Sequence, residues 1–452
     1  MTEEELKAWS ADFESFHARF AHHFVRSEPR EQSLKYLRGL MSTVCRKNSW
    51  QLAEVMGEHR PDSSQRLLYQ AKWDEAGVRD ELIAYVKEAF GSEEGIGVVD
   101  ETGFVKKGSH SVGVKRQYTG TVGKVENCQI GVFLSYAVAE GQTLLDRRLY
   151  LPREWCENRE RRQQAKVPDE VKFQTKPELA AAMLAHAWEQ GVPMRWVTGD
   201  EVYGDSKALR ETITAHEKLY VLAVSCHTLV WHSRWLAEEQ RKTRVLVTVA
   251  DVAMNLAAQQ WQRFAVAEGE KGPRLYDWAA LRVWENDKGH HPGSETWLLC
   301  RRSISDASEL AYYFSNASAD TTVQTLAAVA GQRYTIEQCI EEAKGETGLD
   351  EYEVRYWHSW HRHITLAMMA HAWLAVMRAR AGKKSSTRSG RLDRTGSETF
   401  AGNRIALAVT LNPTAAGMVM LASQTAVRST PQSLSPTFCI SDGQTSLSYL
   451  RL

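Results

Sequence analysis

Two short apolar runs, each ending in an acid, constrain the fold of this chain more than any other feature. Gly95 to Asp100 reads GIGVVD and Met194 to Asp200 reads MRWVTGD, so both runs have strand length and contain glycine. Such runs predict buried strands, and each aspartate is expected at the carboxyl end of its strand, where α/β proteins place polar site residues. The pattern therefore predicts an α/β core with two carboxylates at one edge of its sheet.

The segments around these runs alternate between strand-like and helix-like patterns. Further strands are expected at 128–139, 144–151 and 219–225, and helices at 176–190 and 206–216. This order predicts a mixed sheet flanked by helices. A ribonuclease H-like fold has this order of elements.

A third carboxylate, Glu337, lies in the helical pattern QRYTIEQCIEEAKG. At roughly 100° per residue, Arg333, Glu337 and Lys344 fall within about 40° of one another, beside an apolar stripe. The stripe contains Ile336, Ile340 and Ala343. Taken alone, this is the pattern of a surface helix with an Arg333/Glu337 ion pair. Together with the two aspartates, it predicts a third metal-binding carboxylate, because two divalent ions that clamp a phosphodiester need a few hard oxygen ligands.

Several separated blocks of sequence resemble one family. VVDETGFVKKG, VTGDEVYG and QRYTIEQCIEEAKGETGLDEYEVRYWHSWHRHITLAMMAHAWL resemble insertion-sequence transposases of the Asp-Asp-Glu class, in the branch with a Tyr-Arg-Glu-Lys signature helix. Arg333, Glu337 and Lys344 match the last three signature residues. The tyrosine position is Ala330, and Tyr334 follows the arginine instead. The resemblance extends from about residue 30 to 380.

The resemblance implies a site, a reaction and partners. Asp100, Asp200 and Glu337 are expected to be catalytic and to bind two Mg²⁺ ions, with Mn²⁺ as a substitute, while Arg333 and Lys344 hold phosphates. The enzyme is expected to cut at the ends of its own insertion sequence and to join the freed 3′-hydroxyls to target DNA. Its expected partner is double-stranded DNA, both terminal inverted repeats and target, with a dimer assembled on the DNA ends. Two alternatives stay open, namely a metal-dependent nuclease without strand transfer and a decayed transposase that only binds DNA ends.

The same patterns divide the chain. Residues 1–92 are expected to form a helical, DNA-binding domain, in which Ser49 could cap a helix beside Arg46 and Lys47, although a helical packing domain fits equally well. Residues 93–226 and 319–380 are expected to form the ribonuclease H-like core, the latter with the catalytic helix and a buried helix at 364–376. Residues 227–318 predict a β-rich insertion. Residues 381–452 predict a basic linker and a tail of low order.

Charge is balanced, with 56 basic and 56 acidic residues, which is unexpected for a protein that binds phosphates. Basic residues that contact DNA must therefore be clustered. Beyond the signature helix, the candidates for DNA contact are Lys106, Lys107, Lys271, Arg274 and Arg362. Trp261, Trp278 and Trp284 could present flat faces to an unstacked base, or could fill the core of the insertion.

Other features narrow the setting. Seven scattered cysteines predict neither a zinc finger nor a disulfide scaffold and suit a reducing cytoplasm. The apolar stretch 364–376 is shorter than the ~20 residues a membrane span needs. Histidines 358, 361, 363 and 371 have no ligand-like spacing, so surface or core positions are expected for them. These features predict a cytoplasmic protein with no membrane contact, and the resemblance to insertion-sequence transposases implies a nucleoid-associated protein of a prokaryote.

Overall fold

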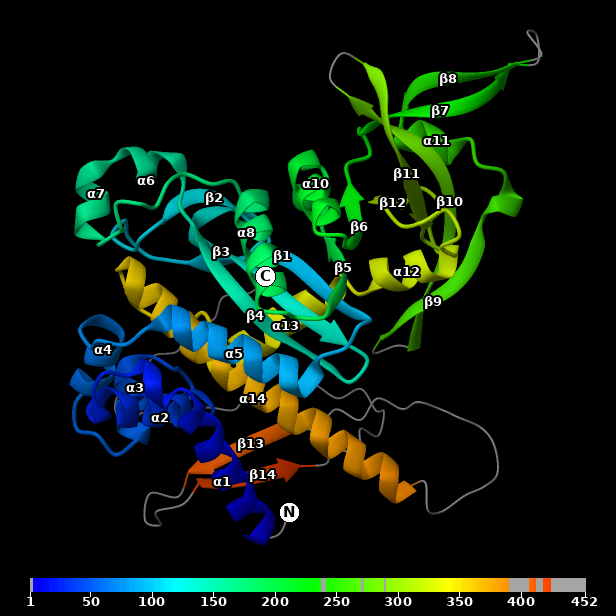
Figure 1. Ribbon diagram of the computed structural model, residues 1–452. Helices are drawn as coiled ribbons and strands as arrows, with labels where there is room; N and C mark the ends of the chain where they lie inside the picture. The colour runs from blue at the N-terminus through cyan, green and yellow to red at the C-terminus, as the bar shows by residue number, and fades with distance from the viewer. Residues whose placement is uncertain are drawn as a thin grey trace, which may run out of the picture.

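A 12-stranded mixed sheet flanked by helices organises the molecule (Figure 1). The computed structural model describes residues 3–236, 241–269, 272–287, 290–389, 406–411 and 418–423. The mixed α/β class predicted from the sequence is confirmed. None of the helices in these ranges is both long enough and apolar enough to cross a bilayer.

The centre of the sheet carries the acids. Its strands follow the order β4-β3-β1-β5-β6, with β3 antiparallel to β1 and β4, and with β5 parallel to both β1 and β6. The bounds are β1 Gly95–Val105, β3 Lys124–Val138, β4 Gly141–Tyr150, β5 Met194–Gly199 and β6 Leu219–Val224. A short strand that the sequence pattern did not reveal, β2 (Lys115–Thr119), pairs with the first part of β3. The five strands expected from the sequence are confirmed, with shifted ends.

Asp100 is not at the end of its strand, contrary to the sequence prediction. β1 continues to Val105, because residues 100–105 keep their antiparallel partners in β3, and Asp100 itself lies opposite Phe133. The parallel pairing of β1 with β5, however, stops at Val99 and Gly199. Asp100 therefore lies where β5 separates from β1, directly across from Asp200, which follows the last residue of β5.

Helices cover the sheet. The expected helices appear as α8 (Lys176–Glu189) and α10 (Lys207–Ala215), preceded by the short helices α6 (Arg153–Glu157), α7 (Arg159–Gln164) and α9 (Glu201–Gly204). The long helix α14 (Trp357–Ser389) packs along β4, and its residues from Ile364 to Met377 are buried. The predicted buried helix is thus confirmed, and His361, His363 and His371 are core residues as expected.

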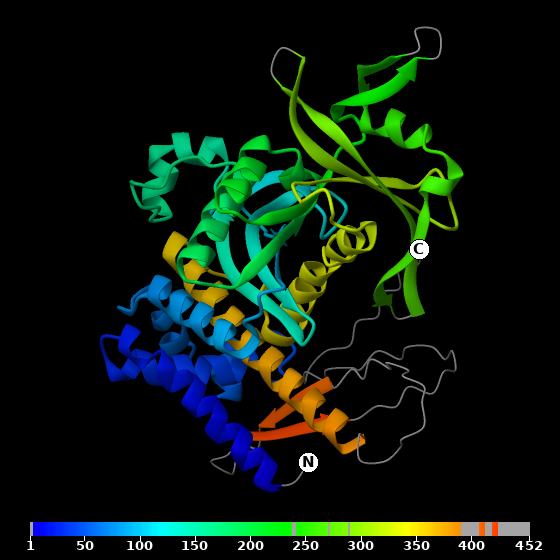
Figure 2. The ribbon, with the colours of Figure 1, turned by 45° about the vertical axis from the view of Figure 1, so that its right-hand side comes forward.

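Strands between Asp200 and Glu337 extend the same sheet. β12 (Leu310–Ser315) pairs with β6, and β11 (His291–Arg302), β10 (Gly272–Asp287), β7 (Leu229–Leu236) and β8 (Arg241–Thr248) continue outward, with β9 (Gln262–Gly269) beside β10. This region also holds α11 (Val249–Met254), and it projects away from the helical layers in two views (Figures 1 and 2). Of its tryptophans, Trp278 is in the core, while Trp261 and Trp284 lie under the guanidiniums of Arg302 and Arg244.

The first ninety residues are helical. Their helices are α1 (Glu3–Arg19), the short 3-10 helix η1 (Ala21–His23), α2 (Ser27–Leu40), α3 (Ser49–Val55), α4 (Asp62–Tyr69) and α5 (Glu75–Phe90). α1 was not expected from the sequence, and it packs through Phe13 against Trp373 of α14, with ring centroids 5.0 Å apart. The cap of α3 is Asn48 rather than Ser49, because the Asn48 side chain accepts hydrogen bonds from the backbone amides of Trp50 and Gln51.

Lys47 and the segment after residue 380 both differ from the expectations. Lys47 is only 5% exposed and donates to the carbonyls of Gly345 and Glu346, so it is not directed at a ligand beside α3. α14 extends to Ser389, into the segment expected to be a linker, and β13 (Ala406–Leu411) pairs with β14 (Met418–Ser423). The rest of the predicted tail lies outside the described residues.

Candidate active site

A cavity of about 620 Å³ brings together the three acids that the sequence singled out. Asp100 comes from β1, Asp200 from the end of β5, and Glu337 from the first turn of α13 (Tyr334–Thr347). Arg333 and Lys344 line the same cavity. The remaining lining residues are Glu101, Thr102, Gly103, Tyr118, Thr119, Gly120, Thr121, Ile130, Ile340 and Glu341.

The two aspartates are held by backbone donors. Oδ1 of Asp100 accepts from the amide of Glu101 at 2.7 Å, and Oδ1 of Asp200 caps α9 by accepting from the amide of Val202 at 2.9 Å. Burial raises the pKa of Asp100 to about 8, helped by the charges of Asp200 and Glu101. Burial and then the charge of Glu101 raise the pKa of Asp200 to about 6. Carboxylates crowded in this way favour a bound cation.

Glu337 is turned toward Arg333. Its carboxylate forms an ion pair with that guanidinium at 3.1 Å, and half of its side chain is exposed. The carboxylate oxygens of Asp100, Asp200 and Glu337 do not all lie within 4.8 Å of one another. The three acids line one cavity, but their carboxylate oxygens are not gathered around a single point.

The far end of α13 contributes a lysine. Nζ of Lys344 donates to Oγ1 of Thr102 at 2.8 Å, and burial lowers the pKa of the ammonium group. Glu341 also lines the cavity, whereas Glu342 faces away and pairs with Arg378 at 3.0 Å. The apolar stripe of this helix is buried as predicted.

Glu101 is a cavity residue that the sequence reasoning missed. Its carboxylate accepts from the hydroxyl of Tyr203 at 2.7 Å and pairs with Lys176 at 2.5 Å. Tyr203 is fully buried, so its hydroxyl holds the Glu101 carboxylate in place. Glu101 directly follows Asp100 in the sequence, but no local pattern indicates its contacts with Tyr203 and Lys176.

The hairpin between β2 and β3 was also missed. Its residues Tyr118 to Thr121 line the cavity, and the hydroxyls of Thr121 and Thr102 lie 3.3 Å apart. Tyr118 is 64% exposed, which is high for a large aromatic side chain. No strand pattern marked this segment, since KRQYT lacks regular apolar alternation.

Three guanidiniums gather around Tyr334, next to the cavity. Those of Arg333 and Arg274 lie 4.9 and 5.0 Å from its ring centroid, and Nη1 of Arg301 donates to its hydroxyl at 3.0 Å. Burial would raise the pKa of Tyr334, but the hydrogen bond and charge of Arg301 outweigh it and lower the pKa. Arg274, an expected DNA contact, thus lies in a cationic group that reaches the active site through Arg333.

The other expected DNA contacts are not lining residues of the cavity. Nζ of Lys106 donates to the carbonyl of Tyr352 and lies 3.5 Å from its ring centroid, while Lys107 is exposed. Arg362 is 8% exposed and pairs with Glu75 at 3.7 Å, a position that favours a structural role. Lys271 lies outside the described residues.

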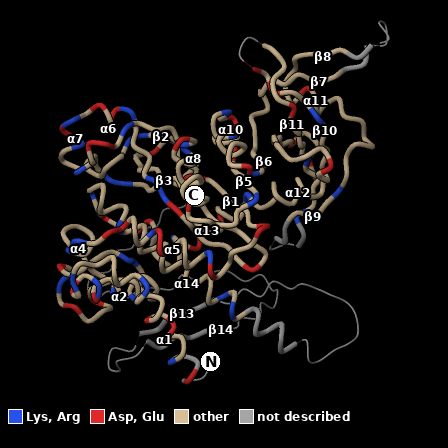
Figure 3. The backbone as a smooth tube through the Cα atoms, viewed as in Figure 1, with Lys and Arg blue, Asp and Glu red and all other residues tan. Residues whose placement is uncertain are grey.

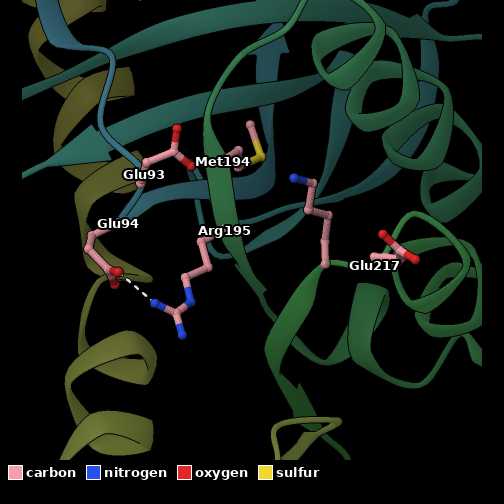
Figure 4. A pocket seen from close by; sticks show the side chains of 6 residues that line it. Glu93, Glu94, Met194, Arg195 and Glu217 are labelled. Carbon is pink, nitrogen blue, oxygen red and sulfur yellow. Dashed lines mark hydrogen bonds and ion pairs between the residues drawn. The ribbon is translucent and has the colours of Figure 1, made fainter.

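A smaller hollow of about 290 Å³ lies at the opposite ends of β1 and β5 (Figure 4). It is lined by Glu93, Glu94, Met194, Arg195, Glu217 and Lys218. Arg195 pairs with Glu94 at 2.6 Å across its rim. Its charges are exposed and partly paired, so the acid-lined cavity is the better candidate for chemistry.

The donor set of the acid-lined cavity fits a hard divalent ion. Five carboxylates, Asp100, Glu101, Asp200, Glu337 and Glu341, line it against two cations, Arg333 and Lys344. Neither cysteine nor histidine is among the lining residues. Oxygen-only donors with excess negative charge suit Mg²⁺ or Mn²⁺ better than softer ions.

The chain is similar to known proteins in two sequence comparisons and one structural comparison. Residues 19–273, more than half of the chain, match the family described as DDE superfamily endonuclease. A relative from Microchaete diplosiphon, described as a probable transposase for insertion sequence element IS701, is 25% identical over 338 residues, which cover 72% of this chain and 77% of the relative. A solved piggyBac transposase synaptic complex with hairpin DNA has a TM-score of 0.35 and 11% identity, covering 79% of this chain and 67% of that one.

The protein is therefore an enzyme of the endonuclease class. The chain belongs to the DDE superfamily endonucleases. Within that class it is an insertion-sequence transposase, as its resemblance to such proteins predicted.

Proposed function

We propose that this transposase cuts DNA at the ends of its own insertion sequence and joins the freed 3′-hydroxyls to target DNA at the acid-lined cavity. The observation that carries this proposal is the convergence of Asp100, Asp200 and Glu337 with Arg333 and Lys344 on that one cavity. Family membership supports it, because it assigns the chain to DNA-cutting enzymes. Asp100, Asp200 and Glu337 are the proposed catalytic residues and metal ligands.

The proposed architecture follows the strand order. In the order β4-β3-β1-β5-β6, β3 runs opposite to the other four strands, and this is the arrangement expected of a ribonuclease H-like core. Residues 93–226 and 319–380 would form this core, and 227–318 a β-rich insertion within it. Residues 1–92 would form a helical DNA-binding domain, and 381–452 an appended segment.

The proposed chemistry has two phosphoryl transfers. In the first, a water oxygen attacks the phosphorus at the element's end and the bond to the 3′-oxygen of the element breaks, which leaves a 3′-hydroxyl. In the second, that hydroxyl attacks a phosphorus of the target, and a target 3′-oxygen leaves. Two Mg²⁺ ions, when bound, activate the attacking oxygen and stabilise the leaving one.

The chain's own residues orient the strand. Asp100 and Asp200 are fixed by backbone amides, so their oxygens are preorganised, while Glu337 swings from its pair with Arg333 to join them. That rotation frees the Arg333 guanidinium to bind the phosphate that enters. Lys344, held by Thr102, supplies a second positive charge at the other end of the cavity.

The DNA is proposed to extend from the cavity across the guanidiniums of Arg333, Arg301 and Arg274. Elsewhere, basic and acidic residues are interspersed along the backbone (Figure 3), so a concentration of like charge is informative. Lys107 is exposed and remains a proposed contact, as do Lys106 and Lys271 from the sequence. Two copies are proposed to assemble on paired DNA ends.

The test is cutting of a DNA fragment that carries the gene's flanking inverted repeats, with Mg²⁺, by wild type and two matched variants. Glu337→Gln removes the proposed ligand, and Glu341→Gln removes a carboxylate one helical turn later that also lines the cavity. We expect Glu337→Gln to lose cutting by on the order of 10³-fold or more, as for other groups that act in the transition state. Glu341→Gln should keep most of it.

The outcomes separate the alternatives. Cutting with joined product supports the transposase reaction, and cutting without joined product supports a nuclease. Binding without cutting by wild type supports a decayed DNA-end binder. Equal cutting by wild type and Glu337→Gln would overturn the assignment of the third ligand.

A further inference from the structure

Two adjacent histidines and a glutamate meet far from the catalytic cavity. His22 and His23 lie in η1, between α1 and α2, and Glu81 lies on the facing side of α5. The two imidazole centroids are 3.9 Å apart, with the rings tilted by 41°. One donor atom from each of the three residues lies within 4.8 Å of the other two. In the described part of the chain, no other three His, Cys, Asp or Glu residues approach so closely.

His23 has a buried nitrogen that its surroundings do not satisfy. Among the residues that the structure describes, Nε2 finds no hydrogen-bond partner, although it is inaccessible to solvent. Buried polar atoms without a partner are rare in folded proteins, so this nitrogen calls for an explanation. Within this group, Nε2 is the ring nitrogen suited to bind a ligand.

The opposite edge of the His23 ring faces a carboxylate. A Cβ on Gly77 would stand 2.4 Å from Nδ1 of His23 and 2.6 Å from Oδ2 of Asp74, so both atoms border the same point. The negative charge of a carboxylate near one imidazole nitrogen favours a cation at the other nitrogen, as it does for metal-binding histidines.

Glu81 has a second carboxylate oxygen that could bind a metal ion. Its Oε1 accepts from Arg19 at 2.9 Å, but Arg19 also holds both oxygens of Glu88, at 2.5 and 2.8 Å. The second oxygen of Glu81 is therefore the one that could bind an ion. The neighbouring guanidinium is compensated by two carboxylates and does not leave excess positive charge at the site.

We propose that His22, His23 and Glu81 form a binding site for a divalent transition metal, with Zn²⁺ as the ion that fits best. Two imidazoles and one carboxylate are a ligand set that zinc adopts, with a fourth position for water. The exposure of His22 leaves that position open to solvent. The ion would tie the turn after α1 to α5, and so would fix the arrangement of the first helices independently of the catalytic acids.

The test is titration of the metal-free, tag-free full-length protein with Zn²⁺ by calorimetry, in excess Mg²⁺. Because Mg²⁺ occupies oxygen-rich sites and competes poorly for imidazole, the catalytic cavity is kept out of the measurement. We expect one strong Zn²⁺ site per chain, and visible absorption typical of tetrahedral coordination when Co²⁺ replaces Zn²⁺.

Four variants make the test specific. His22→Ala and Glu81→Gln each remove a ligand and should weaken Zn²⁺ binding by at least about tenfold. Asp74→Asn keeps the cap of α5, because asparagine caps as well as aspartate, but removes the charge beside Nδ1 and should weaken binding by on the order of 10–100-fold. The double variant His290→Ala/His291→Ala removes another adjacent, exposed histidine pair and should bind as wild type does.

Two results would overturn the proposal: no Zn²⁺ binding by wild type, or affinities of His22→Ala and Glu81→Gln equal to that of wild type. Circular dichroism of each variant distinguishes a lost ligand from a lost fold. Failure here would leave the proposed cutting reaction untouched, since Glu337 and the aspartates are not part of this site.

Discussion

A buried ion pair between Arg210 and Glu285 connects α10 to the outer strands, and its removal is the perturbation we would make first. Arg210 of α10 and Glu285 of β10 are 2.7 Å apart, with side chains 8% and 10% exposed. Arg210 also donates to the carbonyl of Gly204, the last residue of the short helix α9 that Asp200 caps. The Arg210 guanidinium therefore contacts both α9, the helix that Asp200 caps, and β10, a strand of the outer region.

The expected loss of stability depends on which partner of the ion pair remains after the substitution. Arg210→Met leaves a buried carboxylate without its cation, which should lower the free energy of unfolding by about 3–5 kcal/mol. Glu285→Gln keeps an acceptor for the guanidinium and should cost about 1.5–3 kcal/mol. The double variant Arg210→Met/Glu285→Gln leaves no unpaired charge, so it should be more stable than Arg210→Met alone.

The assay is urea unfolding followed by tryptophan fluorescence, with hydrogen exchange of the amides in residues 229–302. Comparison of midpoints at similar slopes gives the change in stability, and exchange localises it. The coupling energy from the four proteins should be about 2 kcal/mol or more. If the double variant is as unstable as the sum of the two single variants, the pair has no mutual stabilisation and the reasoning is refuted.

Three further predictions concern acidity, DNA binding and helix stability. Three core histidines have a lowered pKa, chiefly because of burial, so unfolding takes up protons below pH 6.5. The free energy of unfolding should therefore be highest above pH 6.5 and should fall with decreasing pH, by about 1.4 kcal/mol per pH unit for each histidine. Urea midpoints at pH 7.5 and pH 5 will measure this change. Burial lowers the pKa to about 4 in His17, to about 3 in His361 and to about 4 in His363. Arg301→Ala should weaken DNA binding and reduce the salt slope of the binding constant by about 1 if Arg301 contacts a phosphate, as fluorescence anisotropy at several salt concentrations will measure. Gly345→Ala should stabilise the protein by about 0.4–1 kcal/mol in urea unfolding, because Gly345 is helical and an added Cβ meets nothing within 4 Å.

Controls for these predictions come from the same chain. Arg195→Ala, at the opposite end of the sheet, should leave the salt slope unchanged, and an equal change in both arginine variants would argue against a specific contact. Gly204→Ala should be strongly destabilising, because its Cβ would lie 1.7 Å from the carbonyl oxygen of Ala223. Stability that is flat between pH 7.5 and 5 would contradict the neutral buried histidines.

The edge of α13 that faces the acid-lined cavity was predictable because its signal is local. A single helix sets the angles between Arg333, Glu337 and Lys344, so the periodicity alone indicates which side chains share an edge. The strands at 95–100 and 194–199 were predictable for a similar reason, since they are short apolar runs. α1 could also have been found, because Trp9, Phe13, Phe16 and Phe20 follow helical spacing and pack in or against the core.

The rest of the site depends on pairing between distant segments. Asp100 lies in mid-strand because β3 continues to pair with β1 beyond it, and nothing within GIGVVDETGFV indicates that partner. The group around Tyr334 joins Arg274 of β10 and Arg301 of β11 to α13, a contact between strands and a helix that no local pattern encodes. Glu101 was missed for the same reason, since Tyr203 and Lys176, which hold it, are remote in sequence.

The packing of α14 against the first helices has a consequence for synthesis of the chain. The hydroxyl of Tyr36 bonds Nδ1 of His363 at 2.9 Å, across a separation of 327 residues. At about 5–20 residues per second, the ribosome delivers that partner roughly 16–65 s after Tyr36 has been made. During this interval the apolar faces of α1, α2 and α5 that α14 later covers are exposed on the nascent chain. The helices before residue 90 are thus among the last parts of this chain to complete their core.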